Sequence, residues 1–522
     1  MSNDGEQRQV KQVSSRASAA RRPAVLPVAR SPAILRGRDA AQLDAVLAIV
    51  PYPPPRDIWR RLPQPQRWQE LDAREPPRAA AGVRSATLAN RRQTLIVLGY
   101  LSAGASAFER LSLAGRMLKE VAARNPESIG LASPGGGAQA ARGSLEALLA
   151  ATLAQAFPLP SFRAAGASER RLRRIALLER GALDVRYASA VARGTNLARW
   201  LTALPPNILD ARSYRSALMR LARSHGLTLR WLDERALRAA GAGAFLAVAS
   251  GNGERGAGIA HLSYRPRRRR GRRPDIALIG KGILFDTGGV NLKTHRSMLE
   301  MHTDMSGSAV ALATLIALKE LRAPLAADAW LAITENRIGP DAYRPQEVVQ
   351  AANGVTIQVI HTDAEGRMVL ADTLALAART RPRFMMDFAT LTGACVYSLT
   401  ERMSGVFTNR PRLAATLAAA GQVSGERVWN FPNEPDYDSD LESKVADIQQ
   451  CALEGKGDHI LATRFLSRFV PADCAWVHVD LSSATRSGGL AHVLTDVTGF
   501  GVRFALELIL GQDVLGALER RS

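Results

Sequence analysis

The second half of the chain alternates apolar, strand-like runs with segments of helical spacing. Residues 276–279 (IALI) form an apolar run typical of a buried strand, and residues 308–321 repeat apolar side chains at helical spacing. Strands that alternate with helices favour a mainly parallel α/β sheet, with functional residues at the carboxyl ends of the strands. The pattern continues with expected strands at 329–334, 356–360 and 384–388 and an expected helix at 368–379.

The chain of 522 residues is long enough for two large domains. Residues 1–40 are rich in Arg, Ala, Ser and Gln without a clear period, which predicts a mostly disordered basic tail. Residues 41–185 have the apolar runs and helical spacing of a smaller N-terminal α/β domain. Residues 186–522 are predicted to form the C-terminal domain, an α/β/α structure with a mostly parallel, mixed central sheet.

Positive charge is concentrated in the first half of the chain. Residues 1–275 hold 46 Lys+Arg and 20 Asp+Glu (46 − 20 = +26), and residues 276–522 hold 23 and 28 (23 − 28 = −5). A basic region can bind nucleic acid, anionic lipid or an acidic partner. The run 265–274 (RPRRRRGRRP) fits an exposed hairpin loop better than an anion-binding finger, and no aromatic residue interrupts it to stack on bases. Codon preference explains 62 Arg beside 7 Lys equally well, so the charge defines no function.

Cysteine content and hydropathy indicate a cytoplasmic protein without a membrane partner. The three cysteines form no CxxC pair, which argues against a disulfide framework and a structural zinc knuckle. No apolar run reaches transmembrane length. The apolar stretch 24–35 is interrupted by Arg30 and by prolines, so it does not predict a signal peptide.

Three segments after expected strands combine glycines with carboxylates. They are 280–293 (GKGILFDTGGVNLK), 302–307 (HTDMSG) and 361–367 (HTDAEGR). Glycine permits tight turns and leaves room for a ligand. Carboxylates that converge from several strand ends repel one another unless a cation lies among them, which predicts a metal site. Few histidines beside many carboxylates suit Zn, Mn or Mg.

Four carboxylates exceed the needs of one ion and therefore favour a pair. Asp363 and Glu365 are separated by one residue, so in extended backbone both could face the same centre. Two ions roughly 4 Å apart can hold a bridging hydroxide as nucleophile. A lysine beside such ions could lose its proton and become a ligand, and a second lysine could stay charged and polarise a carbonyl. The pair Lys281 and Lys293 fits these roles in a chain that otherwise uses Arg, and Arg367 could hold a small anion or stabilise an oxyanion.

These segments resemble the leucyl aminopeptidase family, the M17-type cytosol aminopeptidases. The family pattern combines GKG-x-x-FD-x-GG-x-x-x-K, DM-[SG]-G and NTDAEGR, and further similarity includes Asn336. The resemblance covers about residues 190–510 and extends to the front domain only by position. The pattern matches, with its spacing preserved, at Lys281, Asp286, Lys293, Asp304, Asp363, Glu365 and Arg367.

The resemblance implies a two-metal aminopeptidase that removes leucine-like N-terminal residues from peptides. It implies two divalent ions per subunit, Mn or Zn, bridged by Asp286 and Glu365. Asp363 then completes the first metal site, and Lys281 and Asp304 complete the second. The substrate's free amine would bind one ion, which accounts for exopeptidase specificity. A homohexamer is also implied.

The same resemblance assigns the groups around the substrate. It implies that Lys293 binds and polarises the scissile carbonyl and that Arg367 holds a bicarbonate ion as general base. Backbone groups of Leu391 and Gly393 would contact the substrate, and Met301 and Thr390 would line the pocket for its first side chain.

One position departs from the family pattern, and two other functions stay open. His361 stands where the family has Asn; it is either a strand-end residue away from the metals or an additional contact to a ligand. One alternative is a nucleic-acid-binding assembly protein on the aminopeptidase fold that uses the basic first half. The other is a different two-metal hydrolase such as a phosphoesterase, which the Lys281 and Lys293 pair argues against.

Overall fold

The structure divides into two compact units. The first contains residues up to 193 with 422–425 and 487–496, and the second contains 194–421, 426–486 and the residues from 497 on. The sequence predicted a single boundary after residue 185, with 422–425 and 487–496 in the C-terminal domain. In the structure these two short segments belong to the first unit. The computed structural model describes residues 28–30, 40–74, 80–163, 172–178, 183–253, 256–266 and 273–519. Residues 1–27 and 31–39 of the expected tail, and 267–272 of the arginine-rich run, lie outside the described residues.

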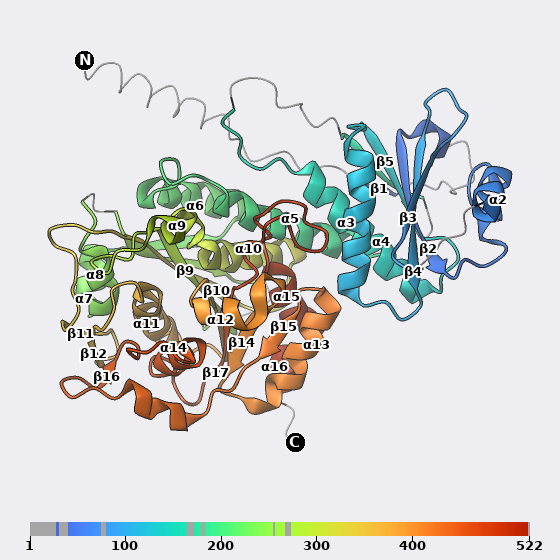
Figure 1. Ribbon diagram of the computed structural model, residues 1–522. Coiled ribbons are helices and arrows are strands. Elements are labelled where there is room, and N and C mark those ends of the chain that lie inside the picture. The colour runs from blue at the N-terminus through green and yellow to red at the C-terminus, as the bar shows by residue number, and fades with distance from the viewer. Residues whose placement is uncertain are drawn as a thin grey trace, which may run out of the picture. The chain divides into compact units, whose positions relative to one another are not determined.

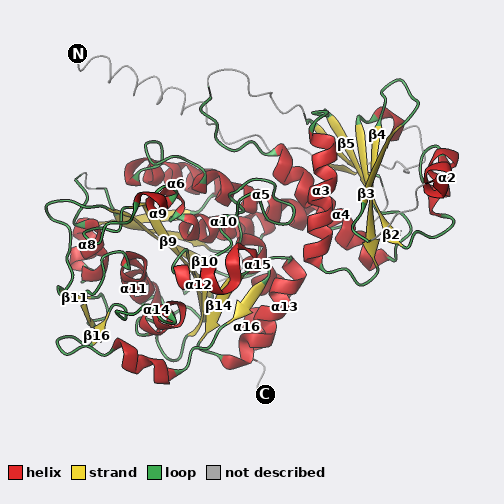
Figure 2. Ribbon diagram, viewed as in Figure 1, coloured by secondary structure: helices red, strands yellow, loops and turns green. Residues whose placement is uncertain are grey.

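The first unit is built on a six-stranded sheet of order β1-β6-β5-β2-β4-β3 (Figures 1 and 2). All neighbours pair in parallel except β3 and β4. The strands are β1 (Val28–Arg30), β2 (Ala45–Tyr52), β3 (Val83–Thr87), β4 (Leu95–Ser102), β5 (Ser128–Ala132) and β6 (Arg174–Leu177). The helices are α2 (Pro65–Arg74), α3 (Ala107–Ala122) and α4 (Ala138–Ala156), with 3-10 turns η1 (Ala40–Gln42) and η2 (Ile58–Arg61).

Strand β2 shows why both faces of this sheet are covered. Its side chains alternate between two cores: Leu47 and Ile49 pack with α3 and α4, and Val46 and Val50 pack with the tryptophans of η2 and α2. An unbroken apolar strand of this kind is typical of a parallel sheet buried on both sides.

The second unit contains an eight-stranded mixed sheet of order β15-β14-β17-β13-β9-β10-β8-β7. The central strands β17, β13, β9 and β10 run parallel, and antiparallel pairs flank them. The predicted fold class is therefore confirmed. The strands are β7 (Thr228–Asp233), β8 (Gly258–Tyr264), β9 (Ile276–Asp286), β10 (Ala327–Asn336), β13 (Phe384–Ala389), β14 (Ser404–Thr408), β15 (Val428–Asn430) and β17 (Ala475–Asp480).

Helices cover both faces of this sheet, as Figures 1 and 2 show for α10 and α11. In β9 the side chains of Ala277 and Ile279 pack with α11, whereas Gly280 faces the start of α10. The helices are α5 (Val185–Thr202), α6 (Ala211–His225), α7 (Glu234–Ala239), α8 (Gly243–Ala249), α9 (His295–Met298), α10 (Ser306–Leu321), α11 (Glu365–Ala378), α12 (Gly393–Leu399), α13 (Ala414–Ser424), α14 (Asp458–Ser467), α15 (Val502–Leu506) and α16 (Val514–Glu519). Shorter turns are η3 (Met301–Thr303), η4 (Thr400–Arg402), η5 (Pro411–Leu413) and η6 (Pro435–Leu441), and Glu507–Gly511 is π-helical.

Two expected strands differ from the structure. The segment expected at 356–360 does not join the main sheet; its first part forms β12 (Thr356–Gln358) in a small sheet with β11 (Val348–Gln350) and β16 (Ile448–Gln449). The strand expected to end at residue 279 continues as β9 to Asp286 because its glycines let α10 approach closely without breaking the ladder. Among the described residues, no helix combines the length and apolar character needed to cross a bilayer.

Candidate functional site

The predicted site residues gather at the carboxyl ends of the central parallel strands. Asp286 is the last residue of β9, Thr390 follows β13, and Glu365 is the first residue of α11. Asp304 lies in the short turn between η3 and α10. A topology with parallel neighbours β13, β9 and β10 brings these ends to one edge of the sheet, as the sequence pattern predicts.

Lys281 lies inside β9 and points toward the α11 face of the sheet. Its side chain runs along the first turn of α11, where a Cβ atom on Gly366 would lie 2.6 Å from Lys281 Nζ. Glycine at 366 therefore provides the space for the lysine stem. Because the side chain is buried, its ammonium group must find anionic partners within the protein.

Two carboxylates and a carbonyl surround the Lys281 ammonium group. Nζ lies 2.9 Å from Asp304 Oδ2 and 2.8 Å from Glu365 Oε1, and it donates to the carbonyl of Thr390 at 3.1 Å. The Thr390 hydroxyl donates to Asp304 Oδ1 at 2.7 Å. Burial lowers the pKa of Lys281, but Asp304, Glu365 and Asp286 outweigh it and raise the pKa above its usual value.

The Lys293 ammonium group forms ion pairs with the carboxylates of Asp286 and Asp363. Its Nζ lies 3.0 Å from Asp286 Oδ2 and 2.6 Å from Asp363 Oδ1. The loop that returns Lys293 to the site turns at Gly288, whose φ of +87° favours glycine. Burial lowers the pKa of Lys293, and the carboxylates of Asp286, Glu365 and Asp363 reverse this effect, so the side chain stays cationic.

A network of amides and hydroxyls holds Asp286 in place. Asp286 Oδ1 accepts hydrogen bonds from Asn336 Nδ2 and from the amide of Gly288, both at 2.8 Å. Asn336 Nδ2 also donates to the carbonyl of Thr362 at 3.0 Å, and the Tyr343 hydroxyl donates to the same carbonyl at 2.7 Å. The sequence singled out Asn336 only as part of the family resemblance. Its position at the end of the strand next to β9 could have indicated a contact with Asp286.

Oxygen atoms from Asp286, Asp363 and Glu365 lie within 4.8 Å of one another and suit a divalent cation. Glu365 Oε2 is buried and has no hydrogen-bond partner among the described residues, so this donor is free for a metal. Burial raises the pKa of Glu365 to about 7, and Asp286 adds to the shift. Burial likewise raises the pKa of Asp304 to about 7 and that of Asp363 to about 6. A cation among these groups would favour their ionised forms, so the residues fit the metal.

The backbone around Asp363 differs from the expectation. Asp363 and Glu365 were expected on one side of an extended segment, but Asp363 lies in a turn and Glu365 starts a helix. The two carboxylates still converge, with oxygen atoms within 4.8 Å of each other.

Arg367 and two of the four predicted substrate contacts, Thr390 and Leu391, have hydrogen-bond partners within the chain. Arg367 is buried on α11 and pairs with Asp458 rather than with the metal-site carboxylates. The amide of Leu391 donates to Asp480 Oδ1 at 3.1 Å. Met301 lies in η3 and Gly393 begins α12, and Thr390 both orients Asp304 and accepts from Lys281.

His361 and Gln450 shape the turn that carries Asp363. The His361 side chain is exposed, and its Nδ1 accepts from the amide of Asp363 at 3.3 Å. Gln450 Oε1 accepts from the amides of Ile360 and His361, and Gln450 Nε2 donates to the carbonyl of Ala364 at 3.0 Å. Gln450 was not predicted as part of the site, because no local sequence pattern connects a residue so distant along the chain with this turn.

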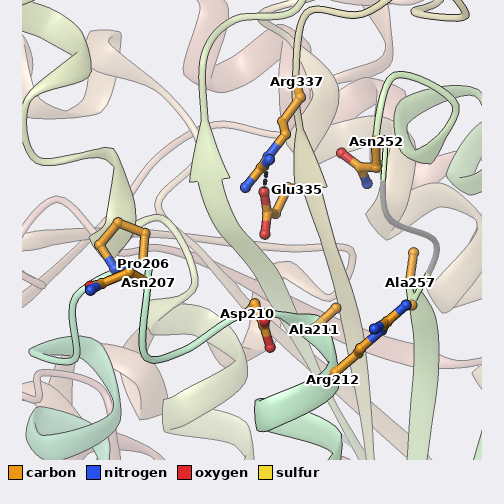
Figure 3. Close-up of a pocket in the computed structure, with 11 residues that line it drawn as sticks. Pro206, Asn207, Asp210, Ala211, Arg212, Asn252, Ala257, Glu335 and Arg337 are labelled. Atoms are coloured by element: carbon orange, nitrogen blue, oxygen red, sulfur yellow. Dashed lines mark hydrogen bonds and ion pairs between the residues drawn. The ribbon is translucent and has the colours of Figure 1, made fainter. Parts of the chain in front are cut away.

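A separate polar cavity of about 320 Å³ lies beside the end of β10 (Figure 3). Glu335 and Arg337 flank the metal-site residue Asn336 in sequence, line this cavity and form an ion pair with each other. The cavity also contains Asp210, Arg212 and Asn252 on its walls. None of the predicted metal or catalytic residues lines it, so it is distinct from the carboxylate cluster.

Known proteins resemble this chain in sequence. A family model described as "Cytosol aminopeptidase family, catalytic domain" matches residues 196–506. A probable cytosol aminopeptidase of Parasynechococcus marenigrum is 36% identical over 421 residues, which cover 79% of this chain and 85% of that protein. A probable cytosol aminopeptidase of Syntrophotalea carbinolica is 39% identical over 336 residues, which cover 64% of this chain and 66% of that protein. The chain thus spans just under two thirds of the length of the latter.

Solved structures of related sequence share the architecture. The bottromycin maturation enzyme BotP in complex with Mn has a TM-score of 0.78 and 28% identity, with 90% of this chain and 99% of that chain covered. A variant of tomato leucine aminopeptidase has a TM-score of 0.81 and 26% identity, with 94% and 97% covered. These matches confirm the predicted family: the chain belongs to the cytosol aminopeptidase family.

Proposed function

We propose that this protein is a metal-dependent aminopeptidase that removes N-terminal residues, with a leucine-like preference, from peptides. The observation that carries the proposal is the buried cluster of Asp286, Asp363 and Glu365 at the carboxyl ends of the parallel strands, between two lysines. Clusters of buried carboxylates with raised pKa values mark functional sites because such burial opposes stability. The similarity to a Mn-bound enzyme supports the choice of Mn, with Zn as the second candidate.

Five side chains would hold two divalent ions. Asp286 and Glu365 would bridge them, Asp363 would complete one site, and Lys281 and Asp304 would complete the other. When bound, such ions supply Lewis acidity and a hydroxide nucleophile at neutral pH. Lys281 must give up its proton to become a ligand, and the arrival of a dication beside its ammonium group would favour that loss.

Lys293 would keep its charge and bind the scissile carbonyl. Its ammonium group is held by Asp286 and Asp363, so its position is fixed before the substrate arrives. A pre-oriented cation stabilises the negative charge that develops on the carbonyl oxygen. The Leu391 carbonyl and the backbone of Gly393 would align the peptide, and Met301 and Thr390 would contact its first side chain.

The decisive experiment is a substrate panel with metal analysis. Protein loaded with Mn or Zn should bind about two ions per chain. It should hydrolyse unblocked leucine anilide and leucyl peptides but not their N-acetylated forms, and chelator should abolish the activity. A loaded protein that cleaves blocked and unblocked peptides equally, or neither, would contradict the proposal.

Three further predictions stay open beside the activity. A homohexamer in the cytoplasm is the assembly that the family resemblance implies, and light scattering of the purified protein would test it. Nucleic-acid binding through the basic first half has no support from the relatives, and a gel shift at low salt would test it. A bicarbonate ion on Arg367 would compete with Asp458, whose carboxylate pairs with the same guanidinium group.

A further inference from the structure

The guanidinium group of Arg367 already has an anion from its own chain. Its Nη2 donates to both carboxylate oxygens of Asp458, at 2.8 and 3.0 Å, and Nη1 donates to the carbonyl of Gln450 at 3.2 Å. The arginine side chain is only 3% exposed, so it requires a compensating charge. Nε, which is buried, has no hydrogen-bond partner among the described residues.

Asp458 is positioned for this contact by its own helix. It is the first residue of α14 and follows Gly457, whose φ of +62° turns the chain into the helix. The positive end of the helix dipole favours a carboxylate at this position. The Asp458 side chain is 26% exposed, which gives solvent access to the carboxylate while the guanidinium stays buried.

A bicarbonate ion on Arg367 would compete with this existing pair. Bicarbonate and a carboxylate both present two oxygens and one negative charge to a guanidinium group. At Nη2 the ion would have to displace Asp458, and at Nε it would bring a second negative charge close to the same carboxylate. The chain therefore supplies the group that the family resemblance assigns to a dissolved anion.

We propose that Asp458 takes the place of bicarbonate on Arg367, so that the enzyme works without a dissolved anion. This inference rests on the proposed function. Asp458 acts through Arg367, two residues after Glu365 on α11, and is therefore a positioning residue. It fixes the guanidinium and keeps a carboxylate on Arg367 at any bicarbonate concentration.

The test removes the Asp458 carboxylate by mutation and then supplies bicarbonate in solution as its replacement. With Asp458→Ala we expect kcat to fall about 10- to 100-fold in bicarbonate-free buffer, as for other residues that orient an active-site group. Tens of millimolar bicarbonate should restore most of this loss, whereas the unchanged enzyme should not respond. In parallel, NMR of ¹³C-labelled bicarbonate should detect binding to Asp458→Ala and none at this site of the unchanged protein.

Two variants separate this role from a structural one. Asp438→Ala removes a similar pair on the same helix, in which Arg464 Nε and Nη2 donate to Asp438 at 2.7 and 2.8 Å. It should show no bicarbonate response. The double variant Arg367→Ala/Asp458→Ala should lose both the rescue and the binding, because the guanidinium group is missing.

Activation of the unchanged enzyme by bicarbonate, with binding at Arg367, would overturn the inference. An active Asp458→Ala variant without rescue and without bound bicarbonate would do the same, because the pair would then only stabilise the fold. If Asp458→Ala does not fold, Asp458→Asn keeps the shape without the charge and replaces it in both measurements. If the metal-loaded protein cleaves no peptide, the proposed function fails, and the binding measurements still decide which anion Arg367 holds.

Discussion

The two units of the chain share the α/β plan but differ in what they bury. Among the described residues of the first unit, the buried polar side chains are those of serines and threonines, such as Thr94, Ser128 and Thr152, and of His492. The second unit buries lysine, aspartate, glutamate and arginine at the carboxyl ends of its central strands, as Lys281 and Glu365 exemplify. The same architecture therefore supports an inert core in one unit and a charged site in the other.

This difference shows that the sheet only positions side chains at its edge. The residue types at those positions decide whether a charged site forms there. Burying an ion opposes folding unless a partner and hydrogen bonds compensate. In the second unit each buried lysine touches two carboxylates, and the carboxylates are in turn held by amides and hydroxyls. Such an arrangement is retained for function rather than for stability.

The largest expected effect follows from removing the shared metal ligand. Glu365→Ala should lower kcat/KM by at least about 1,000-fold, because both ions lose a donor and with them the activated nucleophile. Metal analysis of the purified variant should show that both ions are lost. The matched change in the first unit is Thr94→Val, which removes a buried hydroxyl that donates to the Leu43 carbonyl at 2.6 Å. It should lower stability and leave kcat/KM unchanged; two retained ions in Glu365→Ala would contradict the bridging role.

A smaller loss is expected when the second lysine is shortened. Lys293→Ala should lower kcat about 100- to 1,000-fold, the usual effect of removing one group that stabilises a developing oxyanion. Metal content should stay the same because Lys293 is not a ligand in this arrangement. Lys293→Arg is the control, since it keeps the charge and changes the geometry, and it should retain more activity than Lys293→Ala. Loss of metal from Lys293→Ala would assign this lysine to metal binding instead.

The sequence predicted the parallel sheet and the gathering of carboxylates and lysines at its edge, because these follow from local patterns. Apolar runs and glycine-rich strand ends are short-range signals, and the β9, α10 and β13 segments agree with them. The partners of those residues were not predictable in the same way. Asp458 reaches Arg367, and Gln450 reaches the 360–364 turn, across more than eighty residues of sequence, through helix and strand placement that no local pattern encodes. Their contacts depend on tertiary packing alone.

A moderate effect on stability is expected from a buried carboxylate away from the site. Burial raises the pKa of Asp372 to about 7 although the amides of Phe245 and Ala352 bind the carboxylate at 2.7 Å. The folded state therefore holds its proton more tightly than the unfolded chain, whose aspartate has a pKa of about 3.9. This stabilisation is complete below about pH 4 and is lost as the pH rises toward 7.

The variant that tests this is Asp372→Asn, which cannot titrate. Its free energy of unfolding should decline less than that of the unchanged protein between about pH 5 and about pH 7, by about 2 kcal/mol. Thr152→Val in the first unit removes a neutral buried hydroxyl and should lower stability equally at both pH values. An unchanged pH slope in Asp372→Asn would mean that this carboxylate is not protonated in the folded protein. Denaturant unfolding at each pH gives the comparison.

The smallest effect is expected at a feature that the two units share. Helix α3 of the first unit and helix α6 of the second each begin with a capping box, formed by Ser106 with Glu109 and by Asp210 with Ser213. Ser106→Ala and Asp210→Ala should each lower stability by about 1 kcal/mol, because each leaves a backbone amide of the first turn without its acceptor. Hydrogen exchange should speed up at α3 in one variant and at α6 in the other, with kcat/KM unchanged in both. Ser106→Thr keeps the acceptor and is the control. A loss of activity from either cap would mean that helix-end stability reaches the metal site, and the division between an inert unit and a charged one would then not hold.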